Sequence, residues 1–121
     1  MKVLADSSVW IDHLRQGEPD LSRMLGEGLV QTHSAVIGEL ACGSIHGRDQ
    51  FLRFLQLLPR TAECRPEEAL HLLEEAKLWG IGLSWVDLLL LAACRLSHAH
   101  LWTKDAILAQ TARKLDVGFS I

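Results

Sequence analysis

Four acidic residues, Asp6, Glu39, Asp87 and Asp105, are the part of this sequence best suited to catalysis. Carboxylate oxygens are the ligands that Mg²⁺ and Mn²⁺ prefer. Carboxylates that lie within a few ångströms of one another repel and raise one another's pKa, so such a cluster is stable when a divalent cation joins it. A cation at this position acidifies a bound water and stabilises negative charge in a reaction at phosphorus. The four acids therefore predict metal-assisted phosphodiester hydrolysis.

Short strands alternate with helices along the chain. Strands are expected at residues 2–5, 29–32, 61–64, 100–103 and 117–120. Helices are expected after Ser7 and Ser8, which can cap the first of them, and at residues 21–27, 34–41, 49–57, 66–80, 84–96 and 105–115. This alternation predicts one α/β domain over residues 1–121, with a mostly parallel sheet of about five short strands covered by helices on both faces. Functional groups in such sheets gather beyond the carboxyl ends of the strands.

Two of the acids directly follow predicted strands. Asp6 comes after residues 2–5 and Asp105 after residues 100–103, so both are expected at the same edge of the sheet. Each also has an ordinary structural interpretation. Asp6 can be an N-cap, and Asp105 can lie in the first turn of a helix capped by Thr103, where it favours the helix dipole.

The other two acids lie on predicted helices. Glu39 is beside the apolar stripe of its helix, and the neighbouring Gly38 and Gly43 suggest close approach by another element or by a substrate. Asp87 stands three residues after Ser84, the spacing of a capping pair, at the start of a helix that is apolar all round. A solvated surface glutamate and a simple helix cap are the structural alternatives. The sequence leaves both interpretations open for each residue taken alone.

Four segments resemble, in order, the acidic motifs of PIN domains: VLADSSVWIDHLR, SAVIGELACGS, GLSWVDLLLLAA and LWTKDAIL. The match covers essentially the whole chain, and the first and third segments closely resemble the VapC toxins of toxin–antitoxin pairs. The resemblance implies an α/β/α sandwich and an endoribonuclease that uses Mg²⁺, with Mn²⁺ as a substitute. It also implies an RNA substrate and a cognate antitoxin that neutralises the enzyme.

Matching the four motifs by position shows which residues of this chain correspond to the family's site residues. The resemblance implies that Asp6 and Asp87 are direct metal ligands and that Glu39 and Asp105 complete the quartet. Ser7 takes the small-hydroxyl position after the first acid, and Thr103 takes the threonine of the fourth motif. Many relatives follow that motif with an acid–aromatic pair. Here residues 106–108 are Ala, Ile and Leu, so the fourth acid has a different setting.

Two other functional classes remain to be compared with a nuclease. A PIN-like module that holds RNA or a protein without cutting it would not need all four acids, yet all four are present. A phospho-receiver domain has a similar length and strand-end aspartates. It would need an acceptor aspartate after the third strand, where only Glu63 is available, and a lysine after the last. The nuclease is therefore the favoured interpretation.

A surface for the antitoxin is expected on the helices. The apolar residues predicted to contribute to a groove for an antitoxin segment, or to a symmetric homodimer, are Val9, Trp10, Leu14, Leu21, Leu25, Leu55 and Leu58. Trp10 and Trp85 adjoin the motifs and can stack on an RNA base.

The net charge, the cysteines, the histidines and the apolar runs indicate which cofactors and which cellular compartment to expect. The net charge of −3 does not indicate a nucleic-acid binder, although it does not exclude a metal-dependent one. Cys42, Cys64 and Cys94 contain no CxxC spacing and are expected to be reduced core residues, and the six histidines form no HxxxH pair. The longest apolar run, residues 88–94, is too short to span a membrane, and a cytoplasmic protein is expected.

Overall fold

The computed structural model describes residues 1–120. Three parallel strands form the sheet, in the order β2-β1-β3: β1 is Val3–Ala5, β2 is Val30–Gln31 and β3 is His100–Trp102. The helices are α1 (Ser7–Gln16), α2 (Pro19–Gly26), α3 (Ser34–Ala41), α4 (Arg48–Leu57), α5 (Pro66–Glu75), α6 (Trp85–Ser97) and α7 (Ala106–Lys114). This confirms an α/β fold with a parallel sheet.

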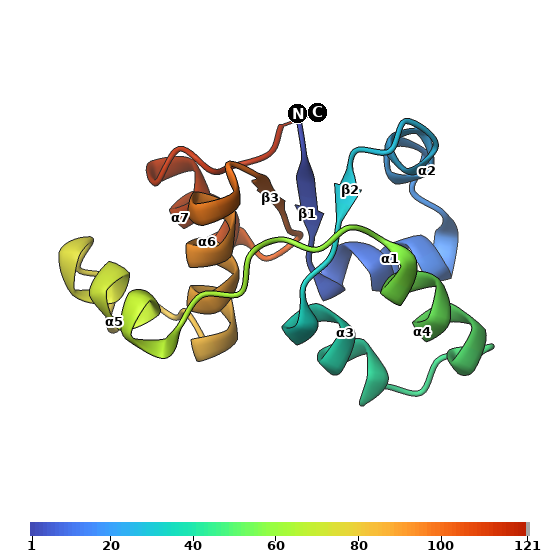
Figure 1. Ribbon diagram of the computed structural model, residues 1–121, viewed down its shortest axis with the longest axis horizontal. Helices are drawn as coiled ribbons and strands as arrows, with labels where there is room; N and C mark the ends of the chain where they lie inside the picture. Colours follow the sequence, from blue (N-terminus) through green and yellow to red (C-terminus); the bar gives the residue numbers. More distant parts are fainter. Residues whose placement is uncertain (121) are drawn as a thin grey trace.

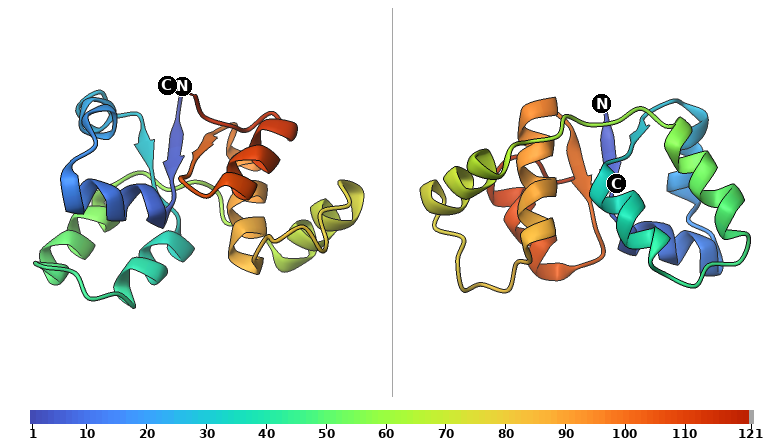
Figure 2. Two further views of the ribbon diagram at one scale, coloured as in Figure 1. Left: turned by 180° about the vertical axis from the view of Figure 1, so that it is seen from behind. Right: turned by 60° about the horizontal axis from the view of Figure 1, so that its bottom comes forward.

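The central strand separates two groups of helices. In Figure 1, α1 to α4 lie on the side of β2, and α5, α6 and α7 lie on the side of β3; the views in Figure 2 show the same division. All three residues of β1 are completely buried, as expected for a central strand covered on both faces.

Local sequence explains where the helices begin and end. Pro19 and Pro66 start α2 and α5 at the first helical turn, where a missing N–H costs nothing. Gly17 ends α1 with a φ of 78°, a left-handed conformation that glycine adopts without strain. The expected helix over residues 66–80 is shorter, because Lys77 has a φ of 54° and the amide of Leu78 turns back to the carbonyl of Leu73.

Two of the five expected strands are absent from residues 1–120. Beside residues 61–64 there is only one bridge, between Arg60 and Thr32; the Thr61 amide still donates to the Thr32 carbonyl, but the Ala62 amide donates to the Ser97 hydroxyl instead. Residues 117–120 likewise pair only through Gly118 with Leu101. The chain runs beside the sheet at both places, but each contact is limited to a single residue.

Three smaller expectations are also wrong. The N-cap of α1 is Asp6 rather than Ser7 or Ser8, and the N-cap of α7 is Asp105 rather than Thr103. Of the three free cysteines, only Cys94 is buried; Cys42 follows the last turn of α3 and is exposed. Among the helices described, none is both long and apolar enough to cross a membrane.

Candidate active site

Asp6 and the residues after β3 meet at one edge of the sheet. Ala5 pairs with Trp102 in the parallel register of β1 and β3, and the Asp6 amide donates to the Trp102 carbonyl at 3.0 Å. Both strands therefore end together. This brings Asp6 beside Thr103, as the arrangement of parallel strands predicted.

The carboxylate of Asp6 is buried and accepts hydrogen bonds at both oxygens. Oδ1 accepts from the Ser8 amide at 2.9 Å and from the Ser8 hydroxyl, and Oδ2 accepts from the Thr103 hydroxyl at 2.6 Å. Burial raises the pKa of Asp6 above its ordinary value, and the hydrogen bonds from Ser8, Thr103 and the Val9 amide partly oppose that rise. The carboxylate is thus held in one orientation while its charge remains costly.

Two hydroxyl groups connect Asp6 to the turn before α7. The Lys104 amide donates to the Ser8 hydroxyl at 2.9 Å, and the Asp105 amide donates to the Thr103 hydroxyl at 3.1 Å. Each hydroxyl accepts one N–H and gives its own proton to the carboxylate. Ser8 was missed as a site residue in favour of Ser7, although its spacing of two residues from Asp6 is that of an Asx turn.

Glu39 lies across from Asp6, on α3. The Ser7 hydroxyl donates to its Oε1 at 3.2 Å, so Ser7 contacts the second acid of the set and not the first. Partial burial raises the pKa of Glu39, the Ser7 bond opposes the rise, and the negative charges of Asp6 and Asp87 add to it. These three acids therefore interact electrostatically.

Gly38 leaves open space beside Glu39. A Cβ added at this glycine would meet nothing within 4 Å, so no neighbouring element approaches it closely. The idea that another part of the fold packs there is wrong. Close approach by a substrate stays a prediction.

Asp87 is also a structural cap. It is the third residue of α6, and its Oδ2 accepts from the Ser84 amide at 3.0 Å while the Ser84 hydroxyl accepts from the Asp87 amide at 3.1 Å. The capping alternative is therefore correct, and it does not exclude a functional role. The charge of Asp87 still raises the pKa of Glu39.

Asp105 is the acid least connected to the others. Its Oδ1 accepts from the Leu108 amide at 2.9 Å, and its link to Asp6 runs through its own amide and Thr103. Within residues 1–120, no three His, Cys, Asp or Glu side chains are already spaced to hold a metal ion. Asp6, Glu39 and Asp87 form an acidic set, and Asp105 lies beside it.

The positive ends of three helices stabilise these negative charges. Asp6 and Asp105 cap the N-termini of α1 and α7, and Asp87 lies in the first turn of α6. Unpaired amides and the helix dipole favour carboxylates at these positions. The N-termini of these helices thus stabilise the negative charge of the acids.

The side chain of Lys104, whose amide contacts Ser8, is engaged elsewhere. The Lys104 ammonium lies 3.1 Å from Oε2 of Glu18 and 5.8 Å from the centre of the Trp102 ring. Its side chain therefore interacts with Glu18 and Trp102, while its backbone amide serves the Ser8 hydroxyl.

An apolar groove adjoins Glu39. It has a volume of about 470 Å³ and lies between α1, α3 and the turn after α3. Its lining residues are Ile11, Leu14, Arg15, Glu39, Leu40, Gly43, Ser44, Ile45 and His46. Of the apolar residues expected to form a groove, only Leu14 lines it.

The other expected groove residues have structural positions. Val9, Trp10, Leu21 and Leu55 are at most 1% exposed and belong to the core, and Leu25 and Leu58 are half-buried against it. Trp10 packs edge-on against Phe51 and Phe54, so its ring is not available to an RNA base. Trp85, the other tryptophan considered for stacking, is 44% exposed.

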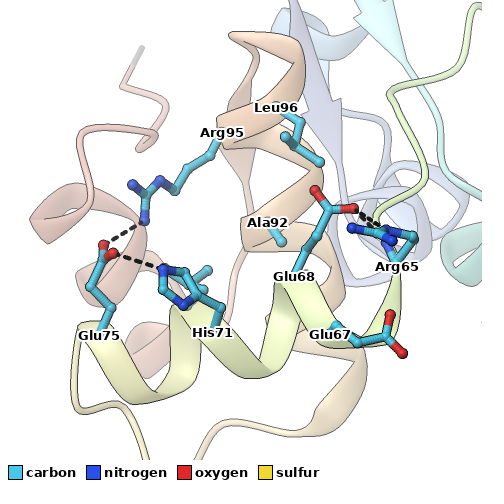
Figure 3. Close-up of a pocket in the computed structure, with 9 residues that line it drawn as sticks. Arg65, Glu67, Glu68, His71, Glu75, Ala92, Arg95 and Leu96 are labelled. Carbon is cyan, nitrogen blue, oxygen red and sulfur yellow. Dashed lines mark hydrogen bonds and ion pairs between the residues drawn. The ribbon is translucent and has the colours of Figure 1, made fainter.

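A second cavity of about 470 Å³ lies between α5 and α6, on the side of β3 (Figure 3). Most of its charged side chains pair with one another: Oε2 of Glu75 lies 3.1 Å from His71, its Oε1 lies 3.8 Å from Arg95, and Arg65 pairs with Glu68. None of the four acids lines it. We therefore assign the chemistry to the acidic set and not to this cavity.

The chain is similar to known proteins over most of its length. The model of the PIN domain matches residues 3–114. Ribonuclease VapC32 from two strains of Mycobacterium tuberculosis, CDC 1551 and H37Rv, is 42% identical to this chain over 104 residues. The aligned part covers 85% of this chain and 84% of each relative.

Proposed function

Because this chain belongs to the PIN domain family, and within it to the VapC ribonucleases, we propose that Asp6, Glu39, Asp87 and Asp105 are the catalytic centre of an RNA-cleaving toxin. The protein is an endoribonuclease of the VapC type. The observation that supports the site most directly is that the adjoining residues Asp6 and Ser7 hydrogen-bond to Thr103 and Glu39, which brings three of the four motifs together at the carboxyl edge of the sheet. A non-cleaving module is not favoured, since the aligned relatives are named ribonucleases.

The donor chemistry fits a hard divalent cation. Every side chain of the set offers carboxylate oxygens. Burial raises the pKa of Glu39, repulsion from Asp6 and Asp87 adds to the rise, and a bound cation would relieve that repulsion. Asp6 and Asp87 would hold Mg²⁺ or Mn²⁺, with Glu39 and Asp105 completing the site. Bound there, the cation would supply Lewis acidity and charge stabilisation at the scissile phosphodiester.

The side chains around the acids fix their orientation. Ser8 and Thr103 donate to opposite oxygens of Asp6, which sets the plane of that carboxylate. Ser7 occupies Oε1 of Glu39 and leaves Oε2 available. Glu39 is exposed and its pKa is raised, so Oε2 is suited to accept a proton from the hydrolytic water.

An antitoxin is the expected protein partner. The groove beside Glu39 has an apolar lining that includes Leu14 and Ile11, with an acid at one end. An antitoxin segment with an apolar stripe would fill it, and a basic side chain of that segment would reach the acidic set. A symmetric homodimer and a cytoplasmic location are further parts of the proposal.

Cleavage and growth assays test this function together. Expression of the wild-type protein alone should arrest growth, and the purified protein should cut total cellular RNA when Mg²⁺ is present. Asp87→Asn should relieve the arrest and abolish cleavage. An asparagine oxygen can still accept from the Ser84 amide, so the α6 cap and the fold are retained.

Leu70→Ala is the control for these assays, since Leu70 is an exposed residue on α5 outside the acidic set. This variant should remain toxic and active. Equal toxicity of wild type and Asp87→Asn at equal expression would contradict the proposal.

A further inference from the structure

Five large apolar side chains are exposed between residues 79 and 107. Leu96 lines the cavity between α5 and α6, and the other four flank Asp87 and Asp105 in the sequence. Trp79, Ile81, Trp85 and Ile107 are each more than two-fifths exposed, and we call them the apolar rim. Large apolar groups left in water at neighbouring positions commonly mark a binding surface. Packing in the core does not explain why these large apolar residues stand at exposed positions.

Trp85 and Ile107 lie in the first turns of the two helices that Asp87 and Asp105 help to start. Trp85 is the first residue of α6, two positions before Asp87. Ile107 lies in the first turn of α7, two positions after Asp105. The segment between α5 and α6 rests on α7, since a Cβ at Gly82 would lie 3.0 Å from the Ile107 side chain.

Trp85 is the rim residue with the most specific chemistry. Its ring is 44% exposed, whereas Trp10 and Trp102 are buried in the core. A half-exposed indole presents a flat apolar surface whose position is fixed by the buried helix behind it. Leu88, Leu91 and the rest of the buried side of α6 hold that helix in place.

The charge of the protein indicates what such a surface contributes. The net charge is −3, the candidate site is acidic, and Lys104 is engaged with Glu18. Attraction to phosphates, which dominates the binding of most nucleic-acid proteins, is accordingly weak here. Stacking of a base on an aromatic ring does not need positive charge, and it works on unpaired bases of any sequence.

We propose that Trp85 stacks against an unpaired nucleobase of the RNA next to the bond that is cut. The inference rests on the proposed ribonuclease function and specifies how the substrate is held at the same site. It assigns to Trp85 a selectivity for single-stranded over paired RNA. Ile107 and Ile81 form the apolar surroundings of the stacked base.

Binding can be measured separately from cleavage. A fluorescently labelled ten-nucleotide oligoadenylate is titrated in EDTA, which prevents metal-dependent cutting. Trp85→Leu should weaken binding roughly 5- to 100-fold, the range expected when stacking of a base is lost. Trp85→Phe should restore most of the affinity, and Leu70→Ala, an apolar residue of similar exposure on α5, should bind as wild type does.

An abasic chain of the same length completes the test. It keeps the phosphates and lacks the bases, so it should bind wild type and Trp85→Leu equally weakly. Sedimentation velocity of each variant shows whether the substitution acts on self-association. Equal affinity of wild type and Trp85→Leu for oligoadenylate, or a loss of binding accompanied by a change in oligomeric state, would overturn the proposal.

Failure of the function is distinguishable from failure of this inference. A wild-type protein that binds oligoadenylate through Trp85 but never cuts RNA contradicts the ribonuclease function and leaves the stacking surface in place. A wild-type protein that cuts RNA while Trp85→Leu binds and cuts equally well contradicts the stacking surface alone.

Discussion

The hydroxyl of Thr103 donates a 2.6 Å hydrogen bond to Oδ2 of Asp6, although 97 positions separate the two residues. The bond joins the ends of β1 and β3, and the same hydroxyl accepts the amide of Asp105. One small side chain thus fixes a buried carboxylate and the start of α7 together.

Removal of this hydroxyl should affect catalysis more than folding. Thr103→Val keeps the shape of the side chain but leaves Oδ2 of Asp6 without its donor. Loss of a residue that orients a metal ligand typically lowers activity by roughly 10- to 100-fold, and we expect a destabilisation of about 1 kcal/mol. Thr103→Ser should restore activity. RNA cleavage rates and urea denaturation check both effects, and full activity of Thr103→Val would contradict the positioning role.

Divalent cations should stabilise the folded protein through Asp6. Calorimetry with Mn²⁺ at about 100 times its Kd should show a gain of about 3 kcal/mol for wild type, because the ion binds only the folded state. Asp6→Asn should show little gain. Ser22→Ala, a substitution on α2 away from the acidic set, serves as the control and should respond as wild type does. Equal responses of wild type and Asp6→Asn would refute the assignment of Asp6 as a ligand.

His33 should make the stability depend on pH in the acidic range. The side chain is buried, its Nδ1 caps α3 by accepting from the Ala35 amide at 2.9 Å, and its Nε2 lies 2.8 Å from Oε2 of Glu63. Burial lowers the pKa of His33 below its ordinary value of 6.5, and Arg60 acts in the same direction while Glu63 opposes it. Below pH 6.5 the unfolded imidazole takes up a proton before the folded one does, so the free energy of unfolding falls.

The comparison with His33→Asn isolates this contribution. Asparagine still accepts the Ala35 amide but does not titrate. The difference in unfolding free energy between wild type and His33→Asn should therefore shift against wild type as the pH falls from 7.5 to 5. Urea denaturation at several pH values measures it, and a difference that stays constant would show that His33 does not titrate as described.

The groove beside Glu39 should bind the antitoxin. Leu14 is 43% exposed and lines that groove, so Leu14→Asp places a charge on an apolar surface. We expect the Kd of the cognate antitoxin peptide to rise at least about tenfold, as for truncation of a central contact residue. Leu70→Asp, on α5, should leave the affinity unchanged. Isothermal titration calorimetry compares the three proteins, and unchanged affinity of Leu14→Asp would place the partner elsewhere.

Sequence patterns identified the acids that follow strands because the end of a strand can be predicted from neighbouring residues alone. A buried apolar segment followed by a carboxylate predicts a strand end, and parallel strands place such ends at one edge. Asp6 and Thr103 meet for that reason. The capping role of Asp87 follows equally from short-range spacing, whereas the cap of α7 was expected at Thr103 and is Asp105.

The choice between Ser7 and Ser8 could not be made in this way. It depends on the exact residue at which α1 begins, since consecutive helical side chains point about 100° apart. With Asp6 as the N-cap, Ser8 turns back to its carboxylate and Ser7 points to Glu39 on α3.

The two tryptophans beside the motifs show that sequence patterns also could not predict which large apolar side chains are buried. Trp10 and Trp85 have similar sequence surroundings, yet one is 1% exposed and the other 44%. The burial of Trp10 depends on Phe51 and Phe54 of α4, about 40 positions further along the chain. Only the assembled fold brings that helix over α1.

Three of the four acids, Asp6, Asp87 and Asp105, also cap a helix or lie in its first turn, and this second role affects which mutations can inactivate the protein. A change to alanine at Asp6, Asp87 or Asp105 removes a carboxylate and also removes a cap that contributes about 1 kcal/mol. A change to asparagine removes the charge alone and leaves an oxygen that can still cap the helix. Inherited loss of activity is therefore expected to favour asparagine, which leaves a folded, inactive chain that still competes for the antitoxin and so alters the dosage balance of the pair.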